Sequence, residues 1–215
     1  VTLSAAHYPG VDGRETPLTT IDSVADAFIG SLRKAAGIPT VLLGYCYGGY
    51  IAHALALRAE REGLPLAGLI LTGATPPGAK DKAYGRDALA GGLEDPENMR
   101  RLRRIYAPLL SHMTADEQNR YWTLFRTSVE ALRDYDFGND TLSTPCVVLT
   151  GQDEEYPYIH EFNDSWRRCF SRCDFRSVPG GHLMMQTHPA TFAQALQDAL
   201  ADLLAGQISR EMSDA

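Results

Sequence analysis

The strongest chemical signal in the chain is the segment Gly44-Tyr45-Cys46-Tyr47-Gly48-Gly49, which lies between an apolar run and a helix of small residues. It follows the G-x-S-x-G pattern of a nucleophile elbow, with cysteine in the place of serine. Such a turn lifts the nucleophile above a sheet, and Gly44 and Gly48 leave room where strand and helix approach each other. The helix N-terminus favours a thiolate. We therefore predict that Cys46 is a nucleophile and that the Tyr47 N–H stabilises an oxyanion.

A thiol nucleophile needs a base and a carboxylate that orients the base, and after an elbow these follow in the order acid, histidine. His182 is the predicted base, because it follows a predicted strand and the loop residues Pro179-Gly180-Gly181. Asp153 lies just past the carboxyl end of another predicted strand, where catalytic groups of open α/β sheets gather. It is the predicted orienting acid. Glu154 and Glu155 are the alternatives.

The other cysteines and histidines are interpreted as structural. Cys146 falls inside an apolar strand-like run, and Cys169 and Cys173 are expected to be incidental free thiols. No C-x-x-C motif occurs, so we predict no metal site and no bound cofactor. His53, on the helix after the elbow, is expected to pack in the core or against the insertion described below, and His188 to start the last helix.

Short apolar runs alternate with amphipathic helices, which predicts an α/β fold with a mostly parallel sheet and helices on both faces. Strands are predicted at 1–6, 40–44, 66–72, 145–150 and about 173–178. Helices are predicted at 50–62, about 158–169 and about 189–205, with a further one from a Thr19–Asp22 capping box to Gly37.

About seventy residues, from 74 to 143, separate two predicted strands and contain only helix-like patches, at 83–91, 99–110 and 116–132. A connection of this length is typical of an active-site lid. We therefore predict one domain over 1–215 that carries a helical lid insertion.

The composition of the chain excludes several classes of function. The 215 residues carry a net charge of −7, with 44% hydrophobic residues. These values fit a globular domain and argue against a nucleic-acid partner. No window approaches the roughly 18 apolar residues of a membrane span, and no secretory signal is present. A cytoplasmic location is expected. The chain opens on a strand-like run without Met, as part of a longer protein would.

Taken together, these motifs resemble the thioesterase domains of nonribosomal peptide and polyketide synthases, which have the α/β-hydrolase fold. The similarity covers most of the chain. It includes Pro9-Gly10-x-Asp12-Gly13, the elbow, the segment 69–77 after it, Thr150-Gly151-x-Asp153, Trp166 and Gly180-Gly181-His182. The resemblance implies a Cys46–His182–Asp153 triad. It implies release of acyl or peptidyl chains from the phosphopantetheine arm of a carrier protein, which would be the partner. It also implies that the insertion covers an acyl channel, lined by Tyr106, Trp122 and Phe125.

The chain departs from the family pattern in three ways. Many chain-terminating members carry the acid right after the strand that here ends at Thr72, where this chain has Gly73. An acid at Asp153 instead resembles the stand-alone editing members. The nucleophile is cysteine rather than serine. The family's first strands are expected to be absent, and with them the loop that gives the second oxyanion donor.

The cysteine favours one outcome of the reaction. An acyl-cysteine intermediate is itself a thioester and keeps the activation of the incoming substrate, which suits closure of a strained lactam or lactone. Cyclising release in nonribosomal peptide biosynthesis is therefore the first hypothesis. Editing hydrolysis of misprimed carriers, a catalytically dead carrier-docking module and a dienelactone-hydrolase-type enzyme are the alternatives. The helical insertion argues against the last of these.

Overall fold

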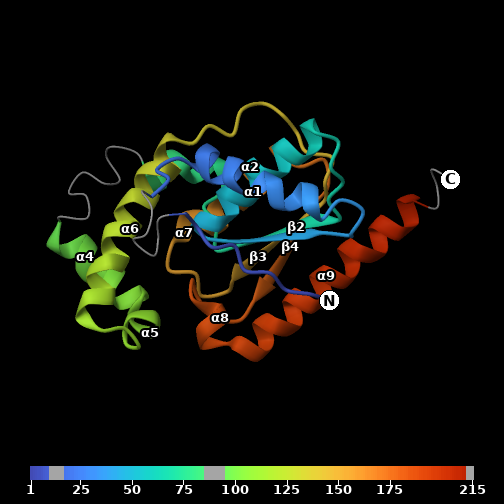
Figure 1. The fold of residues 1–215 in the computed structure, drawn as a ribbon. Coiled ribbons are helices and arrows are strands. Elements are labelled where there is room, and N and C mark those ends of the chain that lie inside the picture. Colours follow the sequence, from blue (N-terminus) through green and yellow to red (C-terminus); the bar gives the residue numbers. More distant parts are fainter. Residues whose placement is uncertain (10–16, 85–94, 212–215) are drawn as a thin grey trace.

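Four parallel strands form the centre of the molecule, in a computed structural model that describes residues 1–9, 17–84 and 95–211 (Figure 1). In spatial order they are β1 (Val41–Tyr45), β2 (Gly68–Thr72), β3 (Cys146–Gly151) and β4 (Cys173–Val178). The register pairs Tyr45 with Thr72 and Gly151 with Val178, at the carboxyl ends of the strands. All four strands therefore end at the same edge of the sheet.

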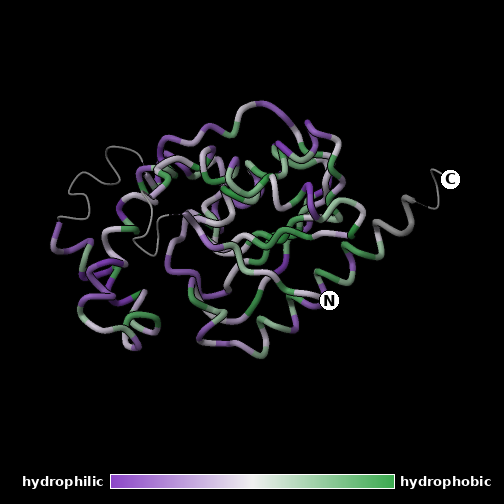
Figure 2. The backbone as a smooth tube through the Cα atoms, in the orientation of Figure 1, coloured by the Kyte–Doolittle hydropathy of each residue, from purple (hydrophilic) through white to green (hydrophobic). Residues whose placement is uncertain are grey.

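Helices cover both faces of this sheet, as the sequence predicts. Leu69 and Leu71 of β2 share one buried cluster with α1 (Ile21–Lys34) and α2 (Tyr47–Arg61). Ile70, between them, belongs to a second cluster with α8 (Met184–Thr187) and α9 (Pro189–Glu211). Successive side chains of a strand point to opposite faces. The inner strands β2 and β3 are accordingly buried and largely apolar along their length (Figure 2), whereas the edge strand β4 also carries Asp174 and Arg176.

The long connection between β2 and β3 is helical, and we call residues 73–145 the helical insertion. It contains a 3-10 turn (Pro77–Ala79), α3 (Lys80–Tyr84), α4 (Pro96–Ile105), α5 (Ala107–Leu110) and α6 (Ala115–Asp134). Most of the predicted helix at 83–91 lies outside the described residues. Helices α4, α5 and α6 form a group at one end of the sheet (Figure 1). None of the described helices combines the length and the apolar character that a bilayer crossing requires.

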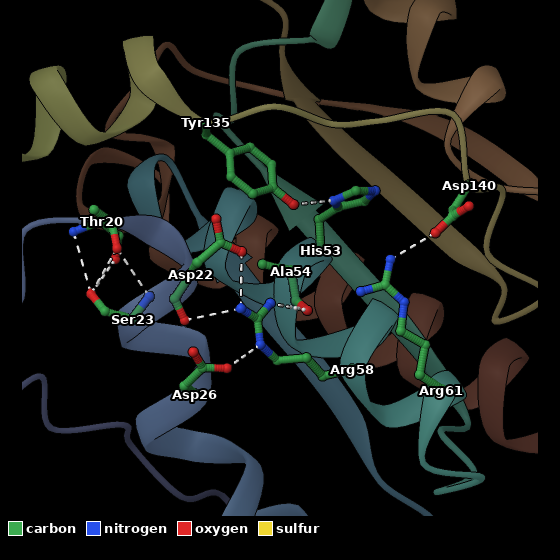
Figure 3. Close-up of polar contacts among 10 residues, drawn as sticks. All are labelled: Thr20, Asp22, Ser23, Asp26, His53, Ala54, Arg58, Arg61, Tyr135 and Asp140. Atoms are coloured by element: carbon green, nitrogen blue, oxygen red, sulfur yellow. Dashed lines mark hydrogen bonds and ion pairs between the residues drawn. The ribbon is translucent and has the colours of Figure 1, made fainter.

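Polar contacts on one side of the sheet hold the helices around α2 (Figure 3). Arg58 of α2 binds Asp22 and Asp26 of α1. The buried His53, also on α2, lies 2.8 Å from the Tyr135 hydroxyl at the end of α6. Burial lowers the pKa of His53 to about 4, so this histidine is a neutral core residue that ties the helical insertion to α2.

Several predicted elements need correction. Residues 1–6 are not a strand, because they pair with no strand among the described residues and a strand requires a partner. The capping box of α1 is formed by Thr20 and Ser23, one residue later than predicted. The helix predicted at 158–169 is split into α7 (Pro157–Glu161) and a 3-10 helix (Asn163–Arg168). Gly206 does not end α9, which continues to Glu211.

Candidate active site

The turn between β1 and α2 holds Cys46 in a strained backbone conformation. Its φ of 51° and ψ of −116° make it the one non-glycine residue with positive φ in the described part of the chain. Such a conformation costs about 1–3 kcal/mol and persists only where the surroundings impose it. The Cys46 N–H donates to the Thr72 carbonyl at 2.8 Å, which fixes the turn to the end of β2. The thiol is half-buried at the carboxyl edge of the sheet.

Glycines allow the close approach that this turn requires. A Cβ atom on Gly44 would lie 2.5 Å from the Gly48 carbonyl oxygen and 2.6 Å from the Gly49 Cα. A Cβ atom on Gly49 would lie 2.6 Å from that of Ala74. At Gly48 the nearest atom would be the Tyr8 hydroxyl oxygen, at 3.2 Å. Gly44 therefore has no room for a side chain, as expected. On α2 the glycine without room for a side chain is Gly49, rather than the predicted Gly48.

Tyr47 is the first residue of α2, so its N–H has no helical acceptor. Its amide makes no hydrogen bond to any residue that the structure describes. A free donor next to the nucleophile at a helix N-terminus is the geometry that stabilises a developing oxyanion. The structure therefore leaves the predicted donor available. The Pro9-Gly10-x-Asp12-Gly13 motif lies mostly outside the described residues.

His182 is brought to the elbow by the loop after β4 and is only 2% exposed. Its main chain is held on both sides: its N–H donates to Glu155 Oε2 at 2.7 Å, and its carbonyl accepts from the Tyr45 hydroxyl at 2.7 Å. Tyr45 directly precedes Cys46, so this second contact ties the histidine loop to the elbow. The predicted nucleophile and base therefore lie side by side.

The carboxylate that faces His182 belongs to Glu154, not to the predicted Asp153. Glu154 Oε1 and Oε2 lie 3.1 Å and 3.4 Å from His182 Nδ1, and the Glu154 side chain is fully buried. Asp153 is exposed, and its N–H donates to the Gly180 carbonyl at 3.0 Å. This hydrogen bond closes the turn in which the Asp153 side chain points outward and the Glu154 side chain points inward. In a run of three acidic residues, the sequence holds no signal for which one turns inward.

Electrostatics make His182 a stronger base than an ordinary imidazole. Burial alone would lower its pKa, but the neighbouring Cys46 and Glu154 outweigh burial and raise the pKa from 6.5 to about 10. Cys46 is thus close enough to act on the ring, although no hydrogen bond of standard geometry joins Nε2 to a described residue. The ring nitrogen that faces away from Glu154 is therefore free to exchange a proton with the thiol.

A cleft of about 1960 Å³ includes Cys46 and His182 in its lining and continues along the β1 edge of the sheet, past α1 and α9. Of the predicted channel residues, Tyr106 and Phe125 line it. Trp122 is not among the described residues that do so, and instead packs on Tyr106 and Phe125 at ring distances of 6.2 and 5.5 Å. The sequence reasoning missed Tyr156, which lines the cleft and stands edge-on to the His182 ring at 5.2 Å.

The residue after β2 also lies next to the base. Gly73 has a φ of 56°, and a Cβ atom there would lie 3.4 Å from His182 Nδ1. A carboxylate at this position could therefore reach the same ring nitrogen that Glu154 contacts. The structure shows two places from which an acid can orient His182, and this chain has a side chain at only one of them.

The remaining thiols lie away from this centre. Cys146 and Cys173 are register partners on β3 and β4, and Cys146 and Cys169 are buried. Burial raises the pKa of Cys146 and of Cys169, the latter to about 11. Within the described residues, no group of three or more His, Cys, Asp or Glu side chains is arranged to hold a metal ion.

Known proteins resemble this chain in sequence over most of its length. AMB antimetabolite synthetase AmbE of Pseudomonas aeruginosa is 27% identical over 220 residues, covering 99% of this chain and 10% of its own length. Probable anguibactin biosynthesis thioesterase AngT of Vibrio anguillarum is 22% identical, covering 91% of this chain and 79% of its own. This chain thus spans about a tenth of AmbE.

Solved structures share the fold. YbtT, a type II thioesterase from the yersiniabactin NRPS/PKS biosynthetic pathway, superimposes with a TM-score of 0.66 at 20% identity, covering 93% of this chain and 82% of that one. The sheet and helices thus have the α/β-hydrolase fold. The family model for the thioesterase domain matches residues 1–200. The chain belongs to the thioesterase domain family.

Proposed function

We propose that this domain releases acyl or peptidyl chains from the phosphopantetheine thioester of a carrier protein, through an acyl-Cys46 intermediate. The observation that carries the proposal is the strained elbow, which holds a half-buried thiol beside a histidine whose Nδ1 faces a buried carboxylate. A packing cysteine would require neither the backbone strain nor the neighbouring base.

In the proposed first step, the proton of the Cys46 thiol has already passed to His182 Nε2, whose pKa is raised to about 10 beside Cys46 and Glu154. The Cys46 thiolate then attacks the thioester carbonyl carbon. The Tyr47 N–H stabilises the negative charge on the carbonyl oxygen. Collapse of the tetrahedral intermediate breaks the bond to the pantetheine sulfur, which takes the proton from His182 as it leaves. Glu154 keeps Nδ1–H in place and stabilises the imidazolium. The acyl chain is then a thioester of Cys46.

Two fates of this acyl-cysteine are supported by different observations. Attack by water, with His182 as the base, releases an acid and regenerates the thiol, which is the reaction of an editing hydrolase. The type II thioesterases among the structural neighbours and the absence of an acid at Gly73 support this fate. Attack by an amine or hydroxyl of the acyl chain would release a ring. The thioester character of the intermediate supports this second candidate.

We further propose that the helical insertion acts as a lid over the acyl chain. Tyr106 and Phe125 line the cleft from the insertion, and Tyr106 stands edge-on to the His182 ring at 5.9 Å. One aromatic side chain of the insertion, Tyr106, therefore packs directly on the base. An apolar cover would exclude water from the charged intermediate and strengthen each electrostatic contact in the site.

The test is the intact mass of the protein after mixing with an acyl-pantetheine thioester. We expect one acyl adduct on the native protein and on Cys173→Ala, a matched control that removes the other half-buried thiol. Cys46→Ala should form none. An adduct that survives in Cys46→Ala would refute the proposed nucleophile.

Identification of the released product separates the two fates. A linear acid from every substrate indicates editing hydrolysis, and a ring from a substrate that carries an internal nucleophile indicates cyclising release. Cys46→Ser distinguishes them again, because an oxoester intermediate lacks the activation that closure of a strained ring needs. Full ring formation by Cys46→Ser would refute the second candidate. A catalytically dead docking module would give neither adduct nor product.

A further inference from the structure

The segment that carries the orienting acid contacts His182 through three consecutive residues. Glu154 faces the ring nitrogen Nδ1, Glu155 accepts the His182 N–H at 2.7 Å, and the Tyr156 ring stands edge-on to the imidazole at 5.2 Å. The position of this segment therefore decides where the base lies and which way its ring points.

This segment has little main-chain support of its own. Gln152 donates to Val178 at the end of β4, Asp153 donates to Gly180 in the following loop, and α7 begins only at Pro157. In the described part of the chain, the one hydrogen bond to the main chain of Glu154 or Glu155 comes from Arg101 of α4, which donates from Nη2 to the Glu155 carbonyl at 2.8 Å. The contact joins residues 54 positions apart.

Arg101 also covers the next residue. Its guanidinium carbon lies 5.5 Å from the centre of the Tyr156 ring, within the range of a cation–π contact. One planar side chain thus holds both the main chain of Glu155 and the ring that packs on His182. A guanidinium, with several donors in a fixed plane, can make both contacts at once, whereas an ammonium makes them poorly.

The neighbouring arginines of α4 do not contact this segment. Arg100 pairs with Glu97 of its own helix, and Arg103 lies 5.8 Å from the centre of the Trp122 ring. Arg100, Arg101 and Arg103 are all exposed on this helix. They therefore allow a comparison between one arginine that reaches the site and two that make other contacts.

We propose that Arg101 is a positioning residue of the active site, which holds the Glu154–Tyr156 segment against His182 from the helical insertion. This inference rests on the proposed function. It makes the orientation of the base depend on where α4 lies. With α4 in place the acid segment is tethered, and any displacement of α4 would release it.

The test compares Arg101→Gln, Arg101→Lys and the control Arg100→Gln for turnover of an acyl-pantetheine thioester. We expect Arg101→Gln to lower kcat about tenfold, the value of one charged hydrogen bond, with KM changed less than twofold. Arg101→Lys should recover part of the loss because it keeps the donor but not the plane. Arg100→Gln should behave as the native protein.

The pH profile of kcat/KM provides a readout that a merely structural role would not move. The titratable groups around His182 are the Cys46 thiol, the Glu154 and Glu155 carboxylates, and three tyrosines, Tyr45, Tyr106 and Tyr156, whose rings pack on the imidazole. If Arg101 no longer holds the segment, Glu154 lies less firmly against His182 and raises its pKa less. The basic limb of the kcat/KM profile should therefore move to lower pH in Arg101→Gln, and not in Arg100→Gln. Urea unfolding midpoints of all variants should agree, because the substituted side chains are exposed.

Two results would overturn the inference. An Arg101→Gln variant with native kcat and pH profile would show that the tether does not position the base. A variant with raised KM and native kcat would show that Arg101 binds substrate instead. Both are distinct from failure of the proposed function, in which the native protein itself would form no adduct and turn over no thioester.

Discussion

Glu154→Gln tests the assignment of the orienting acid most directly. Gln keeps the size of the side chain and can still accept from Nδ1–H, but it removes the charge that stabilises the imidazolium. The carboxylate is fully buried and 3.1 Å from Nδ1, so solvent screens it little. At an effective dielectric constant of about 20, two unit charges at this separation attract by roughly 5 kcal/mol.

That electrostatic value is an upper bound, because Gln retains one neutral hydrogen bond. A hydrogen bond to a charged group is worth about 1.5–3 kcal/mol, and loss of the acid in a comparable serine triad lowers kcat about 10⁴-fold. We therefore expect kcat for acyl-pantetheine hydrolysis to fall between about 10²-fold and 10⁴-fold, or roughly 3–5 kcal/mol in activation free energy.

The assay is release of free pantetheine thiol under steady-state conditions, across a range of pH. Asp153→Asn is the matched control, since Asp153 is adjacent and exposed, and its activity should stay within about twofold of the native value. Because Glu154 helps raise the pKa of His182, the basic limb should also move to lower pH in Glu154→Gln. Loss of activity in Asp153→Asn, with Glu154→Gln unaffected, would refute the assignment.

Three further predictions follow from the same contacts. Gly44→Ala would place a Cβ 2.5 Å from the Gly48 carbonyl oxygen. We therefore expect the free energy of unfolding, measured with urea, to fall by at least about 2 kcal/mol and acylation to be lost. A native unfolding midpoint would contradict this prediction. Gly73→Asp in the Glu154→Gln background should recover at least about tenfold in kcat, because position 73 lies next to His182 Nδ1; no recovery would show that the second acid position is unusable. Burial lowers the pKa of His53 from 6.5 to about 4, so between these pH values the folded state binds fewer protons than the unfolded state. The free energy of unfolding therefore falls by roughly 3 kcal/mol as pH falls from 6.5 to 4. Urea unfolding of His53→Leu should show a smaller pH dependence than that of the native protein.

The sequence predicts those parts of the fold that depend on local pattern. Short apolar runs predict β1 to β3 within one or two residues, and the strand-like segment before Pro179 predicts β4. The elbow motif places Cys46 between a strand and a helix. The same logic finds His182, because a histidine after the last strand of this architecture lies at the catalytic edge. Each of these features is encoded within about ten neighbouring residues.

The parts that the sequence does not predict depend on contacts between distant segments. Whether Asp153 or Glu154 turns inward is decided by the bond from the Asp153 N–H to the Gly180 carbonyl, 27 residues away. Trp122 and Tyr156 are both aromatic and both near the site, yet only Tyr156 lines the cleft. The strand predicted at 1–6 satisfies the local pattern but has no neighbour to pair with in the described structure.

The strained backbone of Cys46 sets stability and activity against each other at one residue. A non-glycine residue at a φ of 51° lowers the free energy of unfolding of the whole domain, and glycine in its place would relieve that cost of about 1–3 kcal/mol. The substitution that most stabilises the turn is therefore one that removes the thiol. Selection for stability alone would favour glycine at this position. Under the proposed function, the chemistry of the thiol is what explains a cysteine here.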